Sequence, residues 1–229
     1  MKRRLFIGSG AAVVAAGGAY WLNGSDAAVG SSNASSGFGA AMAQSSENSA
    51  PIDTSGIVEM TMGDKDAPVT VVEYSSFTCP HCATFHENVL PDIKKNYIET
   101  GKIRYIMREA YFSKYDLWAS LMARCGGEMR YFGIADILMK KQREWLADGK
   151  PDTVVENLRK IGLTAGLTNE DLDACFKDED RVKALVAWYQ ENFTRDEMNS
   201  TPSFMIDGKK YSNMNYADFS ESLDAKLAE

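Results

Sequence analysis

The chain has 229 residues, of which 45% are hydrophobic, and its formal net charge is −7. Roughly 180 residues follow a polar N-terminal segment, which is enough for one domain with a substantial core. The acidic balance argues against nucleic acid or an anionic membrane surface as a partner. The four cysteines, an even number, suit an oxidising compartment in which all of them can pair.

The N-terminus has the features of an export signal. A basic opening, Met1-Lys2-Arg3-Arg4, precedes an apolar stretch rich in Ala and Gly that ends at Leu22, and Arg3-Arg4 resembles a twin-arginine pair. We predict an export signal over residues 1–22 and a Ser/Gly/Ala-rich flexible tether over residues 23–55. The alternative is a retained membrane anchor, but the apolar stretch is short for a membrane helix, which favours cleavage.

The first half of the folded region, residues 56–111, has strand patterns and one long helix. A short strand is expected over Gly56–Met60 and a β-branched strand over Val69–Tyr74. Pro80 begins a helix that we expect to run to about Glu99, kinked near Pro91 because proline cannot donate its backbone hydrogen bond. Ile103–Met107 alternates as a strand does.

The segment Cys79-Pro80-His81-Cys82 lies where the second strand meets the helix. Proline in the first turn removes no intrahelical hydrogen bond. The free N–H groups of that turn favour negative charge at Cys79, which lowers a thiol pKa. Because thiolate is the species that attacks disulfides, the motif predicts thiol–disulfide exchange.

Two other interpretations of the motif are possible. A C-x-x-C pair could form half of a zinc site that Cys125 and Cys175 complete, but these two cysteines are single residues 50 positions apart rather than a second C-x-x-C. An inert structural disulfide is disfavoured because the motif lies between a strand and a helix.

Residues 112–195 show only helical periodicity. Helices are expected around four apolar segments, with a short turn at Leu172–Phe176. The four segments are Leu117–Met122, Phe132–Met139, Val154–Ile161 and Val182–Phe193.

Strand character returns in the last part of the chain, residues 196–229. Ser203–Ile206 and Lys209–Tyr211 flank a tight Asp207-Gly208 turn, and a helix is expected over Tyr216–Leu227. The whole pattern predicts an α/β fold, a thioredoxin-like mixed sheet interrupted by an all-helical insertion over residues 112–195.

Three separated segments resemble the DsbA family of exported thiol:disulfide oxidoreductases. The first is Val72–Cys82, which looks like the active-site segment of that family. The second is Ser200-Thr201-Pro202-Ser203-Phe204 with Asp207-Gly208, which is similar to the signature around the family's cis-proline. The third is Gln142-Arg143-Glu144-Trp145 within the helical insertion. The three occur in the family's order and spacing.

The resemblance implies roles for the residues of the motif. Cys79 is expected to be the nucleophile and Cys82 the buried resolving thiol, so that the two form the redox-active disulfide. The imidazole of His81 is expected to stabilise the Cys79 thiolate, with an exposed helix-start residue as the alternative. Pro80 completes the motif.

Other residues are assigned with the help of the same resemblance. Glu73, the one charge in an apolar strand, is expected to be a buried acid that exchanges a proton with Cys82. The alternative is a partly solvated glutamate. Thr201 and a cis Pro202 are expected to face Cys79 and bind an extended substrate chain.

Two further assignments concern the remaining histidine and cysteines. His86 lies two helical turns from Cys79, too far for direct contact, so we expect an ordinary half-exposed histidine. Cys125 and Cys175 are expected to form a structural or modulating disulfide, with two buried free thiols as the alternative.

The expected function is that of an exported, periplasmic oxidase. It would act as a monomer that donates the Cys79–Cys82 disulfide to reduced, unfolded secreted proteins, without a cofactor or metal. The family implies reoxidation by a membrane quinone-linked oxidase. The alternatives are a disulfide isomerase or reductase of the same fold, and a non-catalytic metal-binding or chaperone-like module.

Overall fold

A computed structural model describes residues 51–229 of the protein. The predicted export signal, residues 1–22, and most of the predicted tether, residues 23–50, lie outside the described residues. Within residues 51–229, no helix has both the length and the apolar character needed to cross a membrane.

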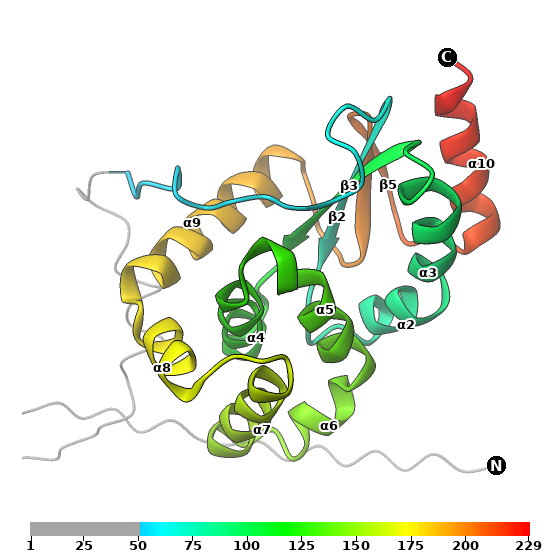
Figure 1. Cartoon of the computed structure of the whole chain (residues 1–229). Helices are drawn as coiled ribbons and strands as arrows, with labels where there is room; N and C mark the ends of the chain where they lie inside the picture. The colour runs from blue at the N-terminus through cyan, green and yellow to red at the C-terminus, as the bar shows by residue number, and fades with distance from the viewer. Residues whose placement is uncertain (1–50) are drawn as a thin grey trace, which may run out of the picture. The chain divides into compact units, whose positions relative to one another are not determined.

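Within the described part of the chain, five strands form one mixed sheet in the order β1-β3-β2-β4-β5 (Figure 1). The central strand β2 pairs in parallel with β3 and antiparallel with β4. It is rich in β-branched residues and buried along nearly its whole length, as expected for a strand with helices on both faces. The strands are β1 (Met60–Met62), β2 (Val69–Ser75), β3 (Ile103–Glu109), β4 (Ser203–Ile206) and β5 (Lys209–Tyr211).

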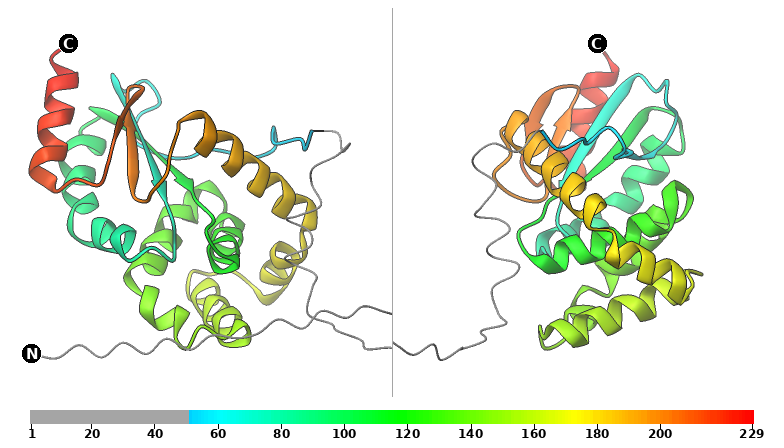
Figure 2. Two further views of the ribbon diagram at one scale, coloured as in Figure 1. Left: turned by 180° about the vertical axis from the view of Figure 1, so that it is seen from behind. Right: turned by 90° about the vertical axis from the view of Figure 1, so that its left-hand side faces the viewer.

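Helices cover both faces of the sheet and form a block beside it. Figure 2 shows α2, α3 and α10 on one side of the sheet and α9 on the other. The helices nearest the sheet are α2 (Pro80–Asn88), α3 (Leu90–Ile93), the π-helix η1 (Lys94–Ile98) and α10 (Tyr216–Leu227). The block comprises α4 (Lys114–Cys125), α5 (Gly127–Lys140), α6 (Gln142–Leu146), α7 (Pro151–Thr164), α8 (Asn169–Lys177) and α9 (Glu179–Arg195).

The first strand differs from its prediction. Gly56–Met60 was the expected range, but β1 begins only at Met60, where its pairing with Met107 of β3 starts. Two residues before Met60, the Val58 carbonyl accepts a hydrogen bond from the Arg124 side chain at 2.8 Å. A side chain therefore satisfies this backbone group outside the strand ladder.

The expected helix from Pro80 to Glu99 is divided into α2, α3 and η1. The break is at Val89, whose backbone leaves the helical region with φ −120° and ψ −50°. Pro91 follows two residues later, and it can neither donate a helical hydrogen bond nor fit easily against the preceding turn. The predicted kink is thus a break between separate helices.

The short turn predicted at Leu172–Phe176, within a region of helical periodicity, is part of a longer helix, α8. A capping box starts it: the Thr168 hydroxyl accepts from the Asp171 N–H, and the Asp171 carboxylate accepts from the Thr168 N–H. These reciprocal hydrogen bonds satisfy two free donors at the helix start.

Candidate active site

Cys79 and Cys82 lie at the start of α2, directly after the central strand. Cys79 is the N-cap residue of the helix, and Pro80 occupies the first turn. Cys79 is half-buried, whereas Cys82, one turn further, is fully buried, and both are free thiols in this structure. No side chain caps the helix. The sulfur of Cys79 therefore stands where an N-cap acceptor would be.

The two thiols have opposite electrostatic environments. The hydrogen bond from the Cys82 thiol is the largest influence on the pKa of Cys79. Together with Thr201 and the backbone N–H groups of residues 82 and 81, it lowers this pKa to about 5, although burial acts in the opposite direction. Burial is the first cause that raises the pKa of Cys82, followed by its hydrogen bond to Cys79 and the charge of Glu73. Cys79 is thus held as thiolate while Cys82 keeps its proton.

His81 is exposed at the surface of α2. Within residues 51–229, its imidazole makes no hydrogen bond or ion pair, and only its backbone N–H contributes to the lowered pKa of Cys79. The predicted electrostatic role of this side chain remains a prediction.

The loop before β4 brings a distant segment to the active cysteine. The Thr201–Pro202 peptide bond is cis, and the Cys79 Sγ lies 3.3 Å from the Thr201 carbonyl oxygen, which accepts a hydrogen bond from Cys79 only when that residue is a protonated thiol. Thr201 is half-buried and Pro202 is buried. The structure therefore places Thr201 beside Cys79, from which it is 122 positions away in the sequence.

Glu73 is fully buried on β2 and is paired. Its two carboxylate oxygens lie 3.1 and 3.0 Å from Nε2 of His86, and the Tyr105 hydroxyl also donates to the carboxylate. Burial alone raises the pKa of Glu73, but the charge and hydrogen bond of His86 and the hydrogen bond from Tyr105 lower it, with a smaller contribution from the nearby Ser75 hydroxyl. The partly solvated alternative for Glu73 is therefore excluded.

The expectation of an ordinary half-exposed His86 is wrong. Its side chain is only 4% exposed and is the partner of Glu73. Periodicity along α2 could not reveal this pairing, since Glu73 lies 13 residues earlier on a strand. The only available signal was the buried acid itself, because a buried charge requires a partner.

The sequence interpretation missed Asp116, which holds the loop before Cys79. This buried carboxylate accepts hydrogen bonds from the Ser76 hydroxyl at 2.7 Å and the Thr78 N–H at 2.9 Å. It also accepts from the N–H groups of Phe112 and Ser113 at the start of α4. The S-x-x-D capping pattern from Ser113 to Asp116 could have indicated the helix start, but not the contact with the loop.

Gln142 holds the same loop from α6. Its amide nitrogen donates to the carbonyl oxygens of Phe77 and Cys79, each at 2.9 Å. The segment that includes Gln142 was singled out by family resemblance, without a role for this residue. The helical block thus contacts the active-site loop through Asp116 and Gln142.

The remaining two cysteines join two helices of the block. Cys125 at the end of α4 and Cys175 in α8 form a disulfide, with their Cα atoms 6.0 Å apart. Both are half-buried. The four-cysteine zinc site is contradicted, because these two sulfurs are bonded to each other.

The family and its members give an independent comparison. A family model described as thioredoxin matches residues 55–225. A putative protein-disulfide oxidoreductase of Rickettsia bellii is 36% identical over 172 residues, which cover 75% of this chain and 65% of the relative. The chain therefore spans slightly less than two thirds of that relative's length.

Solved structures agree with the sequence relatives. The crystal structure of Wolbachia pipientis alpha-DsbA1 matches with a TM-score of 0.66 and 25% identity, over 74% of this chain and 91% of that one. A protein-disulfide isomerase from Novosphingobium aromaticivorans matches with a TM-score of 0.66 and 24% identity, over 75% and 98% of the two chains, and shows the fold alone. The predicted thioredoxin-like α/β fold is confirmed.

Proposed function

The chain belongs to the thioredoxin family and resembles its DsbA members, and from this premise we propose that it is a thiol:disulfide oxidoreductase. More specifically, we propose an oxidase that donates the Cys79–Cys82 disulfide to reduced proteins. The observation that carries the proposal is the contrast between two neighbouring thiols. Cys79 is accessible with a pKa lowered to about 5, and Cys82 is buried with a raised pKa.

The reaction follows from this contrast. A substrate thiolate attacks the Cys79 sulfur, the Cys79–Cys82 bond breaks, and the Cys82 sulfur leaves as a thiolate that takes up a proton. A second substrate thiolate then attacks the mixed disulfide and releases Cys79 as a thiolate. The substrate loses two electrons to the protein, and the low pKa of Cys79 favours the second step because a stable thiolate is a better leaving group.

The neighbouring residues fit this chemistry. Thr201 beside cis Pro202 can offer its backbone to an extended substrate chain as an added strand edge. Glu73, whose charge acts on Cys82, is proposed to exchange a proton with that thiol. Cys125–Cys175 is proposed to be a structural or modulating disulfide of the helical block.

The cellular setting is proposed from the same family resemblance. Residues 1–22 would export the chain to the periplasm, where it would act on reduced, unfolded secreted proteins. Each turnover leaves a dithiol, so an oxidant must remove two electrons, and a membrane quinone-linked oxidase would do so. A retained signal would anchor the domain to the membrane through residues 23–55.

The reduction potential of the Cys79–Cys82 pair tests the oxidase proposal against its alternatives. We expect a value nearer to about −120 mV, typical of disulfide-donating members of this family, than to about −180 mV for isomerases or about −270 mV for reducing thioredoxins. The measurement is equilibration with glutathione buffers. A value near the thioredoxin figure would contradict an oxidase.

An activity assay completes the test. Oxidised protein should form disulfides in a reduced, unfolded substrate, Cys79→Ser should abolish the reaction, and Cys82→Ser should trap mixed disulfides. A chain that binds substrate or metal without exchange would instead be the non-catalytic module, and metal analysis of the reduced protein would identify it.

A further inference from the structure

The buried sulfur of Cys82 must gain a proton while a substrate is bonded to Cys79 at the surface of the active site. In the mixed disulfide, Cys79 is bonded to substrate sulfur and can no longer share a proton with Cys82. Cys82 itself has 0% exposure, and a buried thiolate is unfavourable. A path through the protein from another side would supply this proton without passing the bound substrate.

The side chains of Ser75 and Glu73 form a polar stripe next to Cys82 in an otherwise apolar core. Ser75 and Glu73 are two positions apart on β2, so their side chains share one face of the sheet. The Cys82 Sγ lies against the same end of the strand, where it accepts from the Ser76 N–H at 3.4 Å. Ser75 also contributes to lowering the pKa of both Glu73 and Cys82.

The hydroxyl of Ser75 is buried without a hydrogen-bond partner in the part of the chain that the structure describes. The residue is fully buried, and its Oγ makes no hydrogen bond of good geometry among residues 51–229. A buried hydroxyl without a partner is costly and calls for an explanation. A hydroxyl that reorients between Glu73 and Cys82 as a proton passes provides that explanation.

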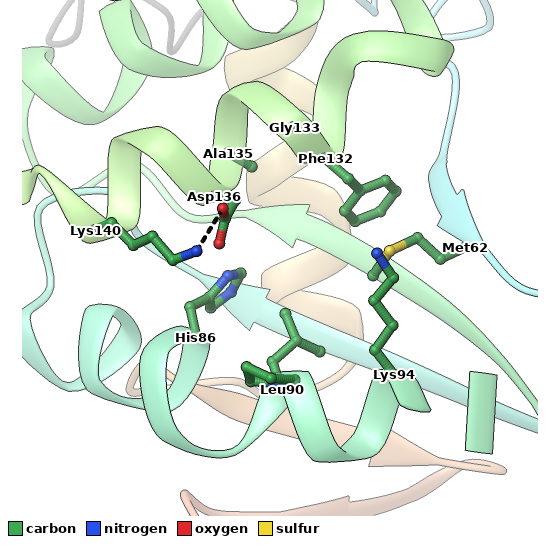
Figure 3. Close-up of a pocket in the computed structure, with 10 residues that line it drawn as sticks. Met62, His86, Leu90, Lys94, Phe132, Gly133, Ala135, Asp136 and Lys140 are labelled. Carbon is green, nitrogen blue, oxygen red and sulfur yellow. Dashed lines mark hydrogen bonds and ion pairs between the residues drawn. The ribbon is translucent and has the colours of Figure 1, made fainter. Parts of the chain in front are cut away.

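The other end of the stripe reaches a pocket. His86, hydrogen-bonded to both oxygens of Glu73, lines a pocket of 310 Å³ between α2 and α5. Figure 3 shows the imidazole pointing towards α5, where Asp136 and Lys140 form an ion pair. Lys94 of η1 also lines the pocket.

We propose that His86, Glu73 and Ser75 form a proton route from this pocket to Cys82. Water in the pocket protonates His86, which passes a proton to Glu73. Glu73 passes it on through the Ser75 hydroxyl to the Cys82 thiolate that leaves when the disulfide opens. The proposal rests on the proposed exchange function. It adds two residues to the prediction for Glu73: His86, which exchanges protons with water in the pocket, and Ser75, which relays the proton between Glu73 and Cys82. An imidazole can exchange protons with water in the pocket because it gains and loses protons near neutral pH.

The charged and titratable groups around the route are few. Tyr105 of β3 donates to Glu73, and Lys94, Asp136 and Lys140 line the same pocket as His86. Asp136 and Lys140 are paired with each other at 2.8 Å. His86 is therefore the group that links the pocket to the buried acid.

The test uses the full chain and measures the reactions of Cys79 and Cys82 as two separate kinetic phases. Reduced protein is mixed with oxidised glutathione and quenched with acid. Cys79 thiolate attacks first and releases one glutathione thiolate in a concentration-dependent phase. Cys82 then loses its proton and attacks the mixed disulfide, which releases the second glutathione thiolate in a unimolecular phase. The proton leaves by the same route in reverse.

We expect Ser75→Ala and His86→Gln to slow the unimolecular phase by about 100-fold, the scale of general acid–base catalysis. The bimolecular phase should stay within about twofold of wild type, because neither side chain contributes to the Cys79 pKa. Glu87→Gln is the matched control, since Glu87 is the exposed neighbour of His86 on α2. Added imidazole should accelerate the unimolecular phase in His86→Ala by entering the pocket.

Ser75→Ala keeps the test decisive if a histidine variant is unstable. It removes a hydroxyl without a partner, so the fold should be retained, and a purely structural role would leave the unimolecular phase unchanged. An unchanged unimolecular phase in Ser75→Ala or His86→Gln overturns the route while exchange by wild type continues. Absence of both phases in wild type would contradict the proposed function as well.

Discussion

At the scale of single residues, the positions of Cys79 and Cys82 at the start of α2 shift the pKa values of two identical thiols in opposite directions. Cys79, at the N-cap, meets the Cys82 thiol and backbone N–H groups, whereas Cys82, one turn later, meets apolar core and the charge of Glu73. The C-x-x-C motif at a helix start was enough to predict the lowered pKa of Cys79, whereas the burial of Cys82 was expected from the family resemblance. The His86–Glu73 pair was not predictable, because it depends on how α2 packs on the sheet.

The lowered pKa of Cys79 gives a first prediction. In reduced protein, the alkylation rate of Cys79 should follow a titration with a midpoint near pH 5, far below the free-thiol value of about 8.5. Cys82→Ala should raise the midpoint, because the Cys82 thiol is the strongest donor to the thiolate. Alkylation rates against pH, resolved by peptide mass, provide the measurement, and a midpoint near 8.5 in wild type would refute an activated nucleophile.

The same assay tests the predicted role of His81. If its imidazole stabilises the Cys79 thiolate, His81→Ala raises the alkylation midpoint and makes the disulfide less oxidising. An unchanged midpoint would show that the exposed ring is a bystander and that the Cys82 thiol, Thr201 and the helix N–H groups account for the low pKa.

Asp116 gives a second residue-scale prediction. Asp116→Ala removes the acceptor for the N–H groups of Thr78, Phe112 and Ser113. At about 1 kcal/mol or more for each donor left without a partner, we expect the free energy of unfolding to fall by about 3 kcal/mol. Disulfide exchange should also slow, because the loop before Cys79 loses its contact with α4.

The matched control is Asp152→Ala, which removes an exposed acid from the first turn of α7. Its effect on denaturant unfolding should stay within about 0.5 kcal/mol. Equal losses in the two variants would show that Asp116 acts only as a helix-start charge.

At the scale of elements, strong periodicity identified the helices, while their ends depended on local chemistry. The capping boxes of α4 and α8 set two helix starts. Pro91 and the backbone at Val89 divided one expected helix into three. The late start of β1 could not be predicted, because it depends on pairing with Met107 and on the Arg124 side chain at Val58.

The Cys125–Cys175 disulfide is an element-scale feature, since it joins α4 to α8 across 50 residues. Replacing both by Ser should lower the free energy of unfolding by up to about 4 kcal/mol, the value for loop closure of this length. Exchange at Cys79 should be retained, because the site contacts the helical block through Asp116 and Gln142 instead. Denaturant unfolding and the exchange assay measure the two effects.

Peptide mapping of unreduced protein provides the control. A mild reductant should open Cys79–Cys82 and leave Cys125–Cys175 joined. A free Cys125, or either residue joined to an active-site cysteine, would defeat the prediction of a structural disulfide.

At the scale of the whole molecule, the active site lies where three parts of the chain meet. The central sheet supplies Glu73 and Ser75, the helical block supplies Asp116 and Gln142, and the loop before β4 supplies Thr201. The order of strands and helices predicted this architecture, and the family resemblance placed the cis-proline loop at the site. The contacts between block and loop required the three-dimensional structure, since they join residues 38 to 65 positions apart.

The same arrangement predicts how the redox state controls stability. Reduced protein contains the Cys79 thiolate, which the folded state favours over the unfolded chain, whereas oxidised protein has no thiolate there. Because the folded pKa is lowered to about 5, the added stability is absent below pH 5. It grows as pH rises and is complete above the free-thiol pKa of about 8.5. Reduced protein should therefore unfold at a higher temperature than oxidised protein at pH 7.5.

Lowering the pH isolates the cause. At pH 4, both folded and unfolded Cys79 are protonated, so the difference in unfolding temperature between the two redox forms should shrink. Cys82 adds nothing in this range, because its raised pKa keeps it protonated in the folded state, as an ordinary thiol is in the unfolded chain. The Cys79–Cys82 disulfide closes a loop too short to constrain the unfolded chain strongly. A difference that is the same at both pH values, or a more stable oxidised form at pH 7.5, would show that the Cys79 thiolate does not drive disulfide donation.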